Sequence, residues 1–170
     1  KKSSIPPLGL LTVASLLPAE WDLTLVDMNV ERLQRSAVSR ADVVFTSSMI
    51  VQRESHERVV RLCNELGTPV VAGGPYPSSG HEGIEGVDHF VLGEAEAALP
   101  RFLADFAEGR AGRVTRGAGR PDLALTPPPR FDLVKRREYS TMAVQYSRGC
   151  PHSCEFCDIV ELFGHRPRTK

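Results

Sequence analysis

The sequence predicts an α/β domain built on a doubly wound parallel sheet, and three observations support this. Short runs of β-branched and aliphatic residues alternate with stretches that repeat apolar residues at helical spacing. The runs are apolar throughout, which is typical of parallel strands buried on both faces. Glycines or other small residues follow several of the runs, as expected of tight turns from strand to helix.

The expected elements follow in chain order. Pro6-Pro7 can begin a helix that runs to Leu17, because proline suits the first helical turn. Residues 54–66 and 95–106 each place their apolar side chains on one face, as a core-facing helix does. The runs that predict strands are residues 23–26, 42–46, 69–72 and 89–92.

The composition changes after residue 108. Residues 109–137 are rich in Arg, Gly and Pro, which favours an extended, semi-rigid linker. Residues 142–146 then alternate and predict a strand that leads into a cysteine-rich loop. We therefore expect an α/β domain over residues 1–108, a linker over 109–137 and the start of a second domain over 138–170.

Charge and length exclude several classes of protein. Lys and Arg number 21 and Asp and Glu number 21, so nothing indicates bulk attraction to nucleic acid or an anionic membrane. No run approaches the roughly 18 apolar residues that a transmembrane helix needs. Four cysteines in 170 residues are too sparse for a disulfide-stapled secreted domain. We expect a cytoplasmic protein with no transmembrane segment and no nucleic-acid partner, and a chain cut from a longer one.

Three of the cysteines, Cys150, Cys154 and Cys157, form the pattern C-x3-C-x2-C. Thiolates are soft ligands that select zinc or iron–sulfur clusters. A structural zinc site usually takes four protein ligands, and no second pair is present, while Cys63 belongs to the buried face of a predicted helix. Three thiolates on a four-iron cluster would leave one iron free to bind a small molecule. Structural zinc remains the alternative.

Small residues follow three of the predicted strands. Ligands of doubly wound sheets lie at the carboxyl ends of the strands, and glycine lets a ligand approach the backbone closely. The alternative for each loop is a tight turn without a ligand. The candidate binding residues are Ser47, Ser48, Gly73, Gly74, Pro75, Gly93 and Glu94.

Taken together, these patterns resemble the radical S-adenosylmethionine (SAM) enzymes that carry an N-terminal cobalamin (B12)-binding domain, in the subgroup that includes the hopanoid C-2 methylases. The stretches that carry the resemblance are residues 6–11, 73–75, 93–96, 145–149 and 158–168 and the cysteine pattern with Phe156 before its last cysteine. The resemblance implies a Rossmann-like cobalamin domain whose first strand precedes Lys1. The first strand and cluster loop of a truncated radical SAM (β/α) partial barrel would follow.

The resemblance also implies cofactors and residue roles. Cys150, Cys154 and Cys157 would hold a [4Fe–4S] cluster whose open iron binds SAM, and Phe156 would contact SAM. The loops of small residues would contact cobalamin. The pattern Asp-x-His-x-x-Gly does not occur in the sequence, so no protein histidine is expected on the cobalt.

The implied activity is cleavage of SAM to a 5′-deoxyadenosyl radical with an external one-electron reductant. The radical would permit C-methylation of an unactivated carbon in a lipid or other small molecule, such as a secondary metabolite. One alternative is a radical SAM enzyme that uses cobalamin without methyl transfer, for rearrangement or ring formation. Another is a cofactor-binding module with no complete active site.

The other polar residues that we considered have plainer expected roles. Glu94 and Glu96 are expected to cap the helix that follows them, although they could form an acid–base pair. The residues expected on the solvated surface are His56, His81, Arg166 and Arg168, the two arginines having contact with SAM or substrate as their alternative.

Overall fold

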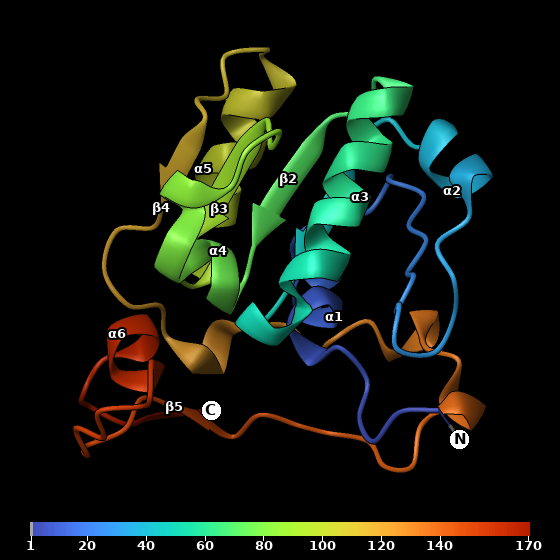
Figure 1. The fold of residues 1–170 in the computed structure, drawn as a ribbon. Helices are drawn as coiled ribbons and strands as arrows, with labels where there is room; N and C mark the ends of the chain where they lie inside the picture. The colour runs from blue at the N-terminus through green and yellow to red at the C-terminus, as the bar shows by residue number, and fades with distance from the viewer. Residues whose placement is uncertain (1) are drawn as a thin grey trace.

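The structure, a computed structural model, describes residues 2–170. Its main unit is a parallel sheet of four strands in the order β1-β2-β3-β4. These strands are Val44–Ser47, Val70–Gly73, His89–Leu92 and Val114–Arg116. Because the strands are parallel, their carboxyl ends meet at one edge of the sheet, the lower edge in Figure 1.

Helices cover both faces of this sheet (Figure 1). The helices on one face are α3 (Arg53–Leu66) and α4 (Pro75–Gly80), and those on the other are α1 (Leu8–Leu16) and α5 (Ala95–Ala107). A further short helix, α2 (Arg35–Ser39), contacts α3. Along β2, Val70 and Ala72 pack towards α3 while Val71 packs towards α5, so successive side chains enter opposite cores. The predicted doubly wound, Rossmann-like α/β fold is confirmed.

Two of the predicted strands are wrong. Residues 23–26 are irregular, and within the described part of the chain β1 bonds to β2 alone, so this run has no neighbouring strand to pair with. Residues 142–146 are also irregular. The strand in that region is β5 (Ser147–Arg148), which pairs antiparallel with β6 (Arg168–Thr169) and forms a two-stranded ribbon.

Strand β4 lies inside the stretch that composition predicted as a linker. Phe90 N donates to Arg113 O at 2.7 Å, so the extended chain satisfies the free edge of β3. The connections through α3 and α5 step the same way across the sheet but lie on opposite faces. The two crossovers therefore have opposite hands, and one of them breaks the right-handed rule.

A third, smaller core joins the start of the chain to residues 131–139. Leu11, Val30, Val134 and Tyr139 are buried together in it. The Tyr139 hydroxyl donates to Asp27 Oδ2 at 2.8 Å, which satisfies both buried polar groups. This core directs the last thirty or so residues beneath the carboxyl edge of the sheet, where α6 (Ile159–Phe163) and β5 lie (Figure 1). No helix within residues 2–170 is long and apolar enough to span a membrane.

Candidate cofactor site at the carboxyl edge of the sheet

The loops after β1, β2 and β3 meet at the carboxyl edge. Tyr76 N donates to Ser48 O at 3.0 Å, which joins the first loop to the start of α4. Gly93 N donates to Ser78 Oγ at 3.0 Å, which joins α4 to the third loop. The structure therefore brings the small-residue loops of the sequence prediction into one site.

The structure requires glycine in these loops for different reasons. A Cβ on Gly73 would lie 2.8 Å from the Val91 carbonyl oxygen, and one on Gly74 would lie 2.3 Å from Ser47 Oγ. The Val91 backbone therefore requires Gly73, and a φ of +86° requires Gly74, as the tight-turn alternative holds. Gly93 has a φ of +82° and open space where a Cβ would be, so this loop leaves room for a ligand.

The side-chain hydroxyl of Ser48, at this edge, lacks a hydrogen-bond partner within residues 2–170. Its side chain is buried, yet its Oγ makes no hydrogen bond to any residue of the described chain. Leaving a buried hydroxyl unpaired costs about 1–3 kcal/mol. The unpaired hydroxyl suits a hydrogen bond to a polar group of a bound cofactor.

Three apolar side chains stand exposed directly after Ser48. Met49, Ile50 and Val51 expose 57%, 64% and 86% of their surface on the turn before α3. A cluster of large exposed apolar side chains at a ligand-binding edge is typical of a surface that an apolar ligand covers. Ile50 and Val51 are not among the residues that the sequence predicted to bind a ligand. The available signal was an apolar triplet at the end of a strand, where a helix normally begins with polar residues.

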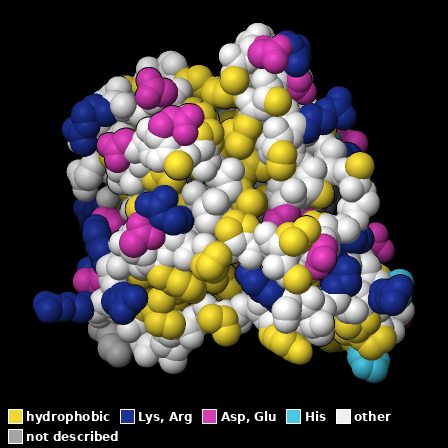
Figure 2. All heavy atoms as spheres, turned by 180° about the vertical axis from the view of Figure 1, so that it is seen from behind, with side chains coloured by type: hydrophobic (Ala, Val, Ile, Leu, Met, Phe, Trp, Pro, Cys, Tyr) yellow, Lys and Arg dark blue, Asp and Glu magenta, His cyan; other side chains and the backbone are white. Residues whose placement is uncertain are grey.

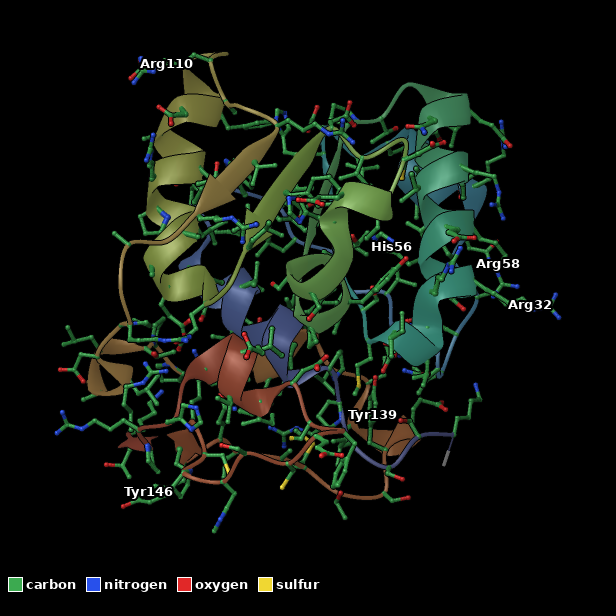
Figure 3. The ribbon with its side chains drawn as sticks, turned by 60° about the vertical axis from the view of Figure 1, so that its left-hand side comes forward. Arg32, His56, Arg58, Arg110, Tyr139 and Tyr146 are labelled. Carbon is green, nitrogen blue, oxygen red and sulfur yellow. The ribbon has the colours of Figure 1, made fainter. Side chains whose placement is uncertain are left out.

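His56 is buried, so the prediction that it is exposed is wrong. It belongs to α3 and lies on the side that faces α4 (Figure 3). Its ring is edge-on to that of Tyr76, with ring centroids 5.9 Å apart. Its Nε2 lies 3.2 Å from Thr46 Oγ1, and burial lowers its pKa. Its spacing to Val59 and Cys63 places it on the buried face of α3, a signal that the sequence contained. His81 is also not fully exposed, because it lies against Phe90.

The three cysteines of the pattern lie on the loop between β5 and β6. All are free thiols, with Cys154 exposed and Cys150 and Cys157 half-buried. Cys157 N donates to Cys154 O at 3.1 Å, which tightens the end of the pattern into a turn. Within residues 2–170 no three His, Cys, Asp or Glu side chains converge to hold a metal. Three thiols on one short loop are nevertheless a donor set that fits an iron–sulfur cluster.

Two further residues bear on the cysteine predictions. Cys63 is fully buried, and burial raises the pKa of its thiol to about 11, so it is not available as a ligand. Its predicted place on the buried face of a helix is confirmed. Phe156, the expected SAM contact, exposes 91% of its surface and packs against nothing that would bury it.

A family model described as the B12 binding domain matches residues 2–103. The chain belongs to the B12-binding domain family. This confirms the cobalamin-binding domain that the sequence resemblance implied.

Several relatives of this B12-binding chain are curated proteins. An uncharacterized methyltransferase of Synechocystis sp. is 42% identical over 172 residues, which are 100% of this chain and 32% of the relative. The hopanoid C-2 methylase of Rhodopseudomonas palustris is 35% identical over 98% of this chain and 32% of its own. The anaerobic magnesium-protoporphyrin IX monomethyl ester cyclase of Synechocystis sp. is 27% identical over 92% and 38%. The chain spans about a third of the length of these relatives.

An ion-pair cluster joins the B12-binding domain to the cysteine segment. Arg148 Nη1 lies 2.9 Å from Glu94 Oε2, and Arg148 Nη2 lies 2.7 Å from Glu96 Oε1. Arg168 Nη2 lies 2.6 Å from Glu94 Oε1. Burial raises the pKa of Glu96, but the hydrogen bond and charge of Arg148, with a backbone hydrogen bond and one from Thr126, outweigh burial and hold this pKa below its usual value. We call these four charged residues, two Glu and two Arg, the acid–arginine cluster.

The cluster corrects two sequence predictions. Glu94 stands at the N-cap position of α5, but its side chain makes no capping hydrogen bond because the arginines occupy its carboxylate. Arg168 does not lie on a solvated face, because it pairs with Glu94 and donates to Pro121 O at 2.8 Å. Arg166 remains exposed. Charges this far apart in sequence gave no signal of their pairing.

A hollow of about 270 Å³ adjoins the acid–arginine cluster. It lies between α1, the proline-rich residues 127–129 and β5. Its walls are largely apolar, and its cationic side chains are Arg148 and Lys170. From behind, hydrophobic side chains gather in the lower half of the molecule, on both sides of a notch (Figure 2). Apolar surface therefore extends beyond the sheet edge, beneath which the cysteine segment lies.

Proposed function

We propose that this chain is the cobalamin- and cluster-binding part of a cobalamin-dependent radical SAM enzyme. One observation carries the proposal. The loop with C-x3-C-x2-C is held at the carboxyl edge of the B12-binding sheet, through Arg148 and Glu94. A corrin and an iron–sulfur cluster bound by these residues would therefore be neighbours, as joint use of the two cofactors requires.

The cobalamin site is assigned to the three loops of the sheet edge. Ser47, Ser48, Gly73, Gly74, Pro75 and Gly93 would line the cofactor, as the sequence predicts. The unpaired Ser48 hydroxyl would bond to a polar group of the cofactor, and the exposed triplet Met49 to Val51 would cover its apolar surface. Glu94 is left out of this set, because its carboxylate is already paired with Arg148 and Arg168.

The iron–sulfur cluster is assigned to Cys150, Cys154 and Cys157. The open loop leaves Cys154 and Phe156 exposed, so the aromatic ring is free to pack on a bound SAM. When bound, the iron–sulfur cluster would supply the electron that cleaves SAM, and cobalamin would carry the methyl group. The chain's residues hold these groups side by side, and an external one-electron reductant completes the system. We place the enzyme in the cytoplasm.

The proposed reaction is C-methylation of an unactivated carbon in a lipid or secondary metabolite. The names of two relatives, a methyltransferase and a hopanoid C-2 methylase, favour it. A second candidate is ring formation or rearrangement without methyl transfer, which the relative named as a cyclase favours. A module that binds the cofactors without catalysis by itself is compatible with both.

A reconstitution experiment tests the cofactor assignment. The chain is incubated anaerobically with iron, sulfide and hydroxocobalamin, desalted, and analysed for iron, zinc and corrin. We expect a brown protein in which Cys154→Ala abolishes iron uptake and leaves corrin retention intact. Cys63→Ala is the matched control and should retain both. A protein that holds zinc and no iron on the same cysteines would contradict the assignment.

Labelled SAM separates the two candidate reactions. The complete enzyme is supplied with SAM labelled in its methyl group, a reductant and a lipid extract. Label recovered in a lipid product supports methylation. Release of 5′-deoxyadenosine without transfer of label supports the second candidate.

A further inference from the structure

We propose that Glu94 and Glu96 are positioning residues that hold the cysteine loop at the carboxyl edge of the B12-binding sheet by pairing with Arg148 and Arg168. The assignment rests on the proposed function, because that function makes the loop a cluster carrier. It replaces the expectation that Glu94 contacts cobalamin.

The two arginines mark the base of the cysteine loop. Arg148 precedes the three cysteines in the chain and Arg168 follows them, and the two residues are direct partners in the β5–β6 ribbon. Gly149 has a φ of +94°, and a Cβ there would lie 2.5 Å from Arg166 O. The segments before and after the cysteines therefore pass very close to each other. Whatever holds this pair of arginines therefore holds both ends of the loop.

The ribbon cannot hold itself at this place. Like charges directly opposite each other on paired strands repel, and a two-stranded ribbon is marginally stable at best. Each strand is only two residues long. Within residues 2–170, none of residues 140–170 is buried. The repulsion between the guanidinium groups must be met by negative charge from elsewhere.

Glu94 and Glu96 supply that charge from a rigid part of the fold. They lie where buried β3 passes into α5, and their side chains are only 2% and 9% exposed. Glu94 bonds to both arginines, one through each carboxylate oxygen. Glu96 accepts hydrogen bonds from both terminal nitrogens of Arg148, at 3.0 and 2.7 Å. Such bidentate, charge-assisted bonds are much stronger and more directional than exposed ion pairs.

A third arginine brings α6, at the far end of the loop, to the same carboxylate. Arg120 Nη1 lies 3.4 Å from Glu94 Oε1 and also donates to the Leu162 carbonyl on α6. One carboxylate thus contacts the chain before the cysteines and after them. The same turn begins with Gly93, whose loop is assigned to cobalamin. A single turn of the B12-binding domain therefore sets where the cysteine loop lies relative to the corrin site.

Thiol alkylation in the chain without cofactors tests the proposal. Rates of iodoacetamide labelling at each cysteine are measured by mass spectrometry for Glu94→Gln and Glu96→Gln. Glu57→Gln is the matched control, because Glu57 pairs with Arg53 on an exposed helix face at 2.7 Å. We expect half-buried Cys150 and Cys157 to react about tenfold faster in the two test variants, given the usual worth of charged hydrogen bonds. Exposed Cys154 should change little, and buried Cys63 should stay unreactive, which shows that the sheet is folded.

A double-mutant cycle checks that the effect passes through the pair. Arg148→Gln should alone speed the labelling of Cys150 and Cys157, while buried Cys63 stays unreactive if the sheet remains folded. Adding Glu96→Gln to Arg148→Gln should change the rates little, because Arg148→Gln already removes both bonds between Arg148 and Glu96. Additive effects would contradict the proposed role.

Cobalamin retention after desalting distinguishes the rival role of Glu94. If Glu94→Gln releases cobalamin and leaves the labelling rates at the control level, Glu94 is a cofactor contact and the proposal is wrong. Rates equal to those of Glu57→Gln in both test variants overturn it as well. The wild-type chain reports separately on the proposed function, since it must take up iron and corrin before any variant is compared.

Discussion

The sheet and the cysteine segment are stabilised in opposite ways. Phe90, Leu99 and Phe102 in and behind the sheet are essentially inaccessible to solvent. Within residues 2–170, the segment from residue 140 to 170 buries no side chain, and ion pairs to Glu94 and Glu96 join it to the sheet. Apolar burial depends weakly on pH, whereas ion pairs require ionised carboxylates. The scaffold should therefore persist under conditions in which the cysteine loop is released.

The largest effect is expected from Phe102, which fills the core between α5 and the sheet. Phe102→Ala should lower the free energy of unfolding by about 3–5 kcal/mol, since it creates a cavity that the sheet cannot close. Denaturant titration followed by circular dichroism measures the loss. Leu125→Ala, at an exposed leucine, is the control and should leave the midpoint unchanged. An equal loss at both positions would contradict the division into core and surface.

The next effect concerns acid release of the cysteine loop. The folded pKa of Glu96 lies below its ordinary value of 4.5, so its stabilising contribution is present above pH 4.5 and is lost as the pH falls through the folded pKa. In an NMR titration, amide signals of residues 147–169 should move to their unfolded positions before those of β3. Glu96→Gln should show the released positions already at neutral pH. Loss of the β3 signals first would contradict the comparison.

A smaller effect is expected in the sheet, where burial of a histidine, rather than an ion pair, makes the free energy of unfolding depend on pH. Burial lowers the pKa of His56 from 6.5, so below pH 6.5 the unfolded chain binds a proton that the folded chain resists. The free energy of unfolding should fall as the pH drops from 7.5 to 5.5, by at most about 1.4 kcal/mol per pH unit. Chemical denaturation at several pH values measures this slope. His56→Gln should flatten the profile, and an unchanged slope in this variant would assign the titration to another group.

The smallest effect is expected at the exposed pair of Arg53 and Glu57. Removing the carboxylate by Glu57→Gln should leave the unfolding midpoint and the cysteine labelling unchanged, because exposed ion pairs are screened and contribute little. Thermal unfolding in low salt is the most sensitive check. A marked loss there would show that ion pairs on this protein matter regardless of burial, and would weaken the special role given to Glu94 and Glu96.

Local patterns predicted much of the scaffold. Strands β2 and β3 and helices α3 and α5 were found because apolar periodicity and glycine breaks act over a few residues. A local pattern also gave a wrong prediction at residues 23–26, because this run of strand-forming residues has no neighbouring strand to pair with. The sequence does not predict strand β4, because its three residues lie in an arginine- and glycine-rich stretch that does not favour strands. Only pairing with β3 makes them a strand at the edge of the sheet.

The site divides in the same manner. The cysteine pattern and the small residues at the strand ends are visible in the sequence, because ligand spacing and turn chemistry are local. The exposed triplet Met49 to Val51 could be recognised as a surface only when the loops around it were in place. Glu94 and Arg148 are 54 residues apart, and their pairing depends on where β3 ends and where the ribbon crosses.

The amino-acid sequence by itself determined the doubly wound α/β fold, the relation to B12-binding domains and the three cysteines on one loop. These properties reside in the order and spacing of neighbouring residues. Tertiary structure alone decided that Glu94 and Glu96 face the arginines and that the cysteine loop lies at the sheet edge. Coulomb attraction and desolvation depend on distance and burial in space, and the folded chain establishes both.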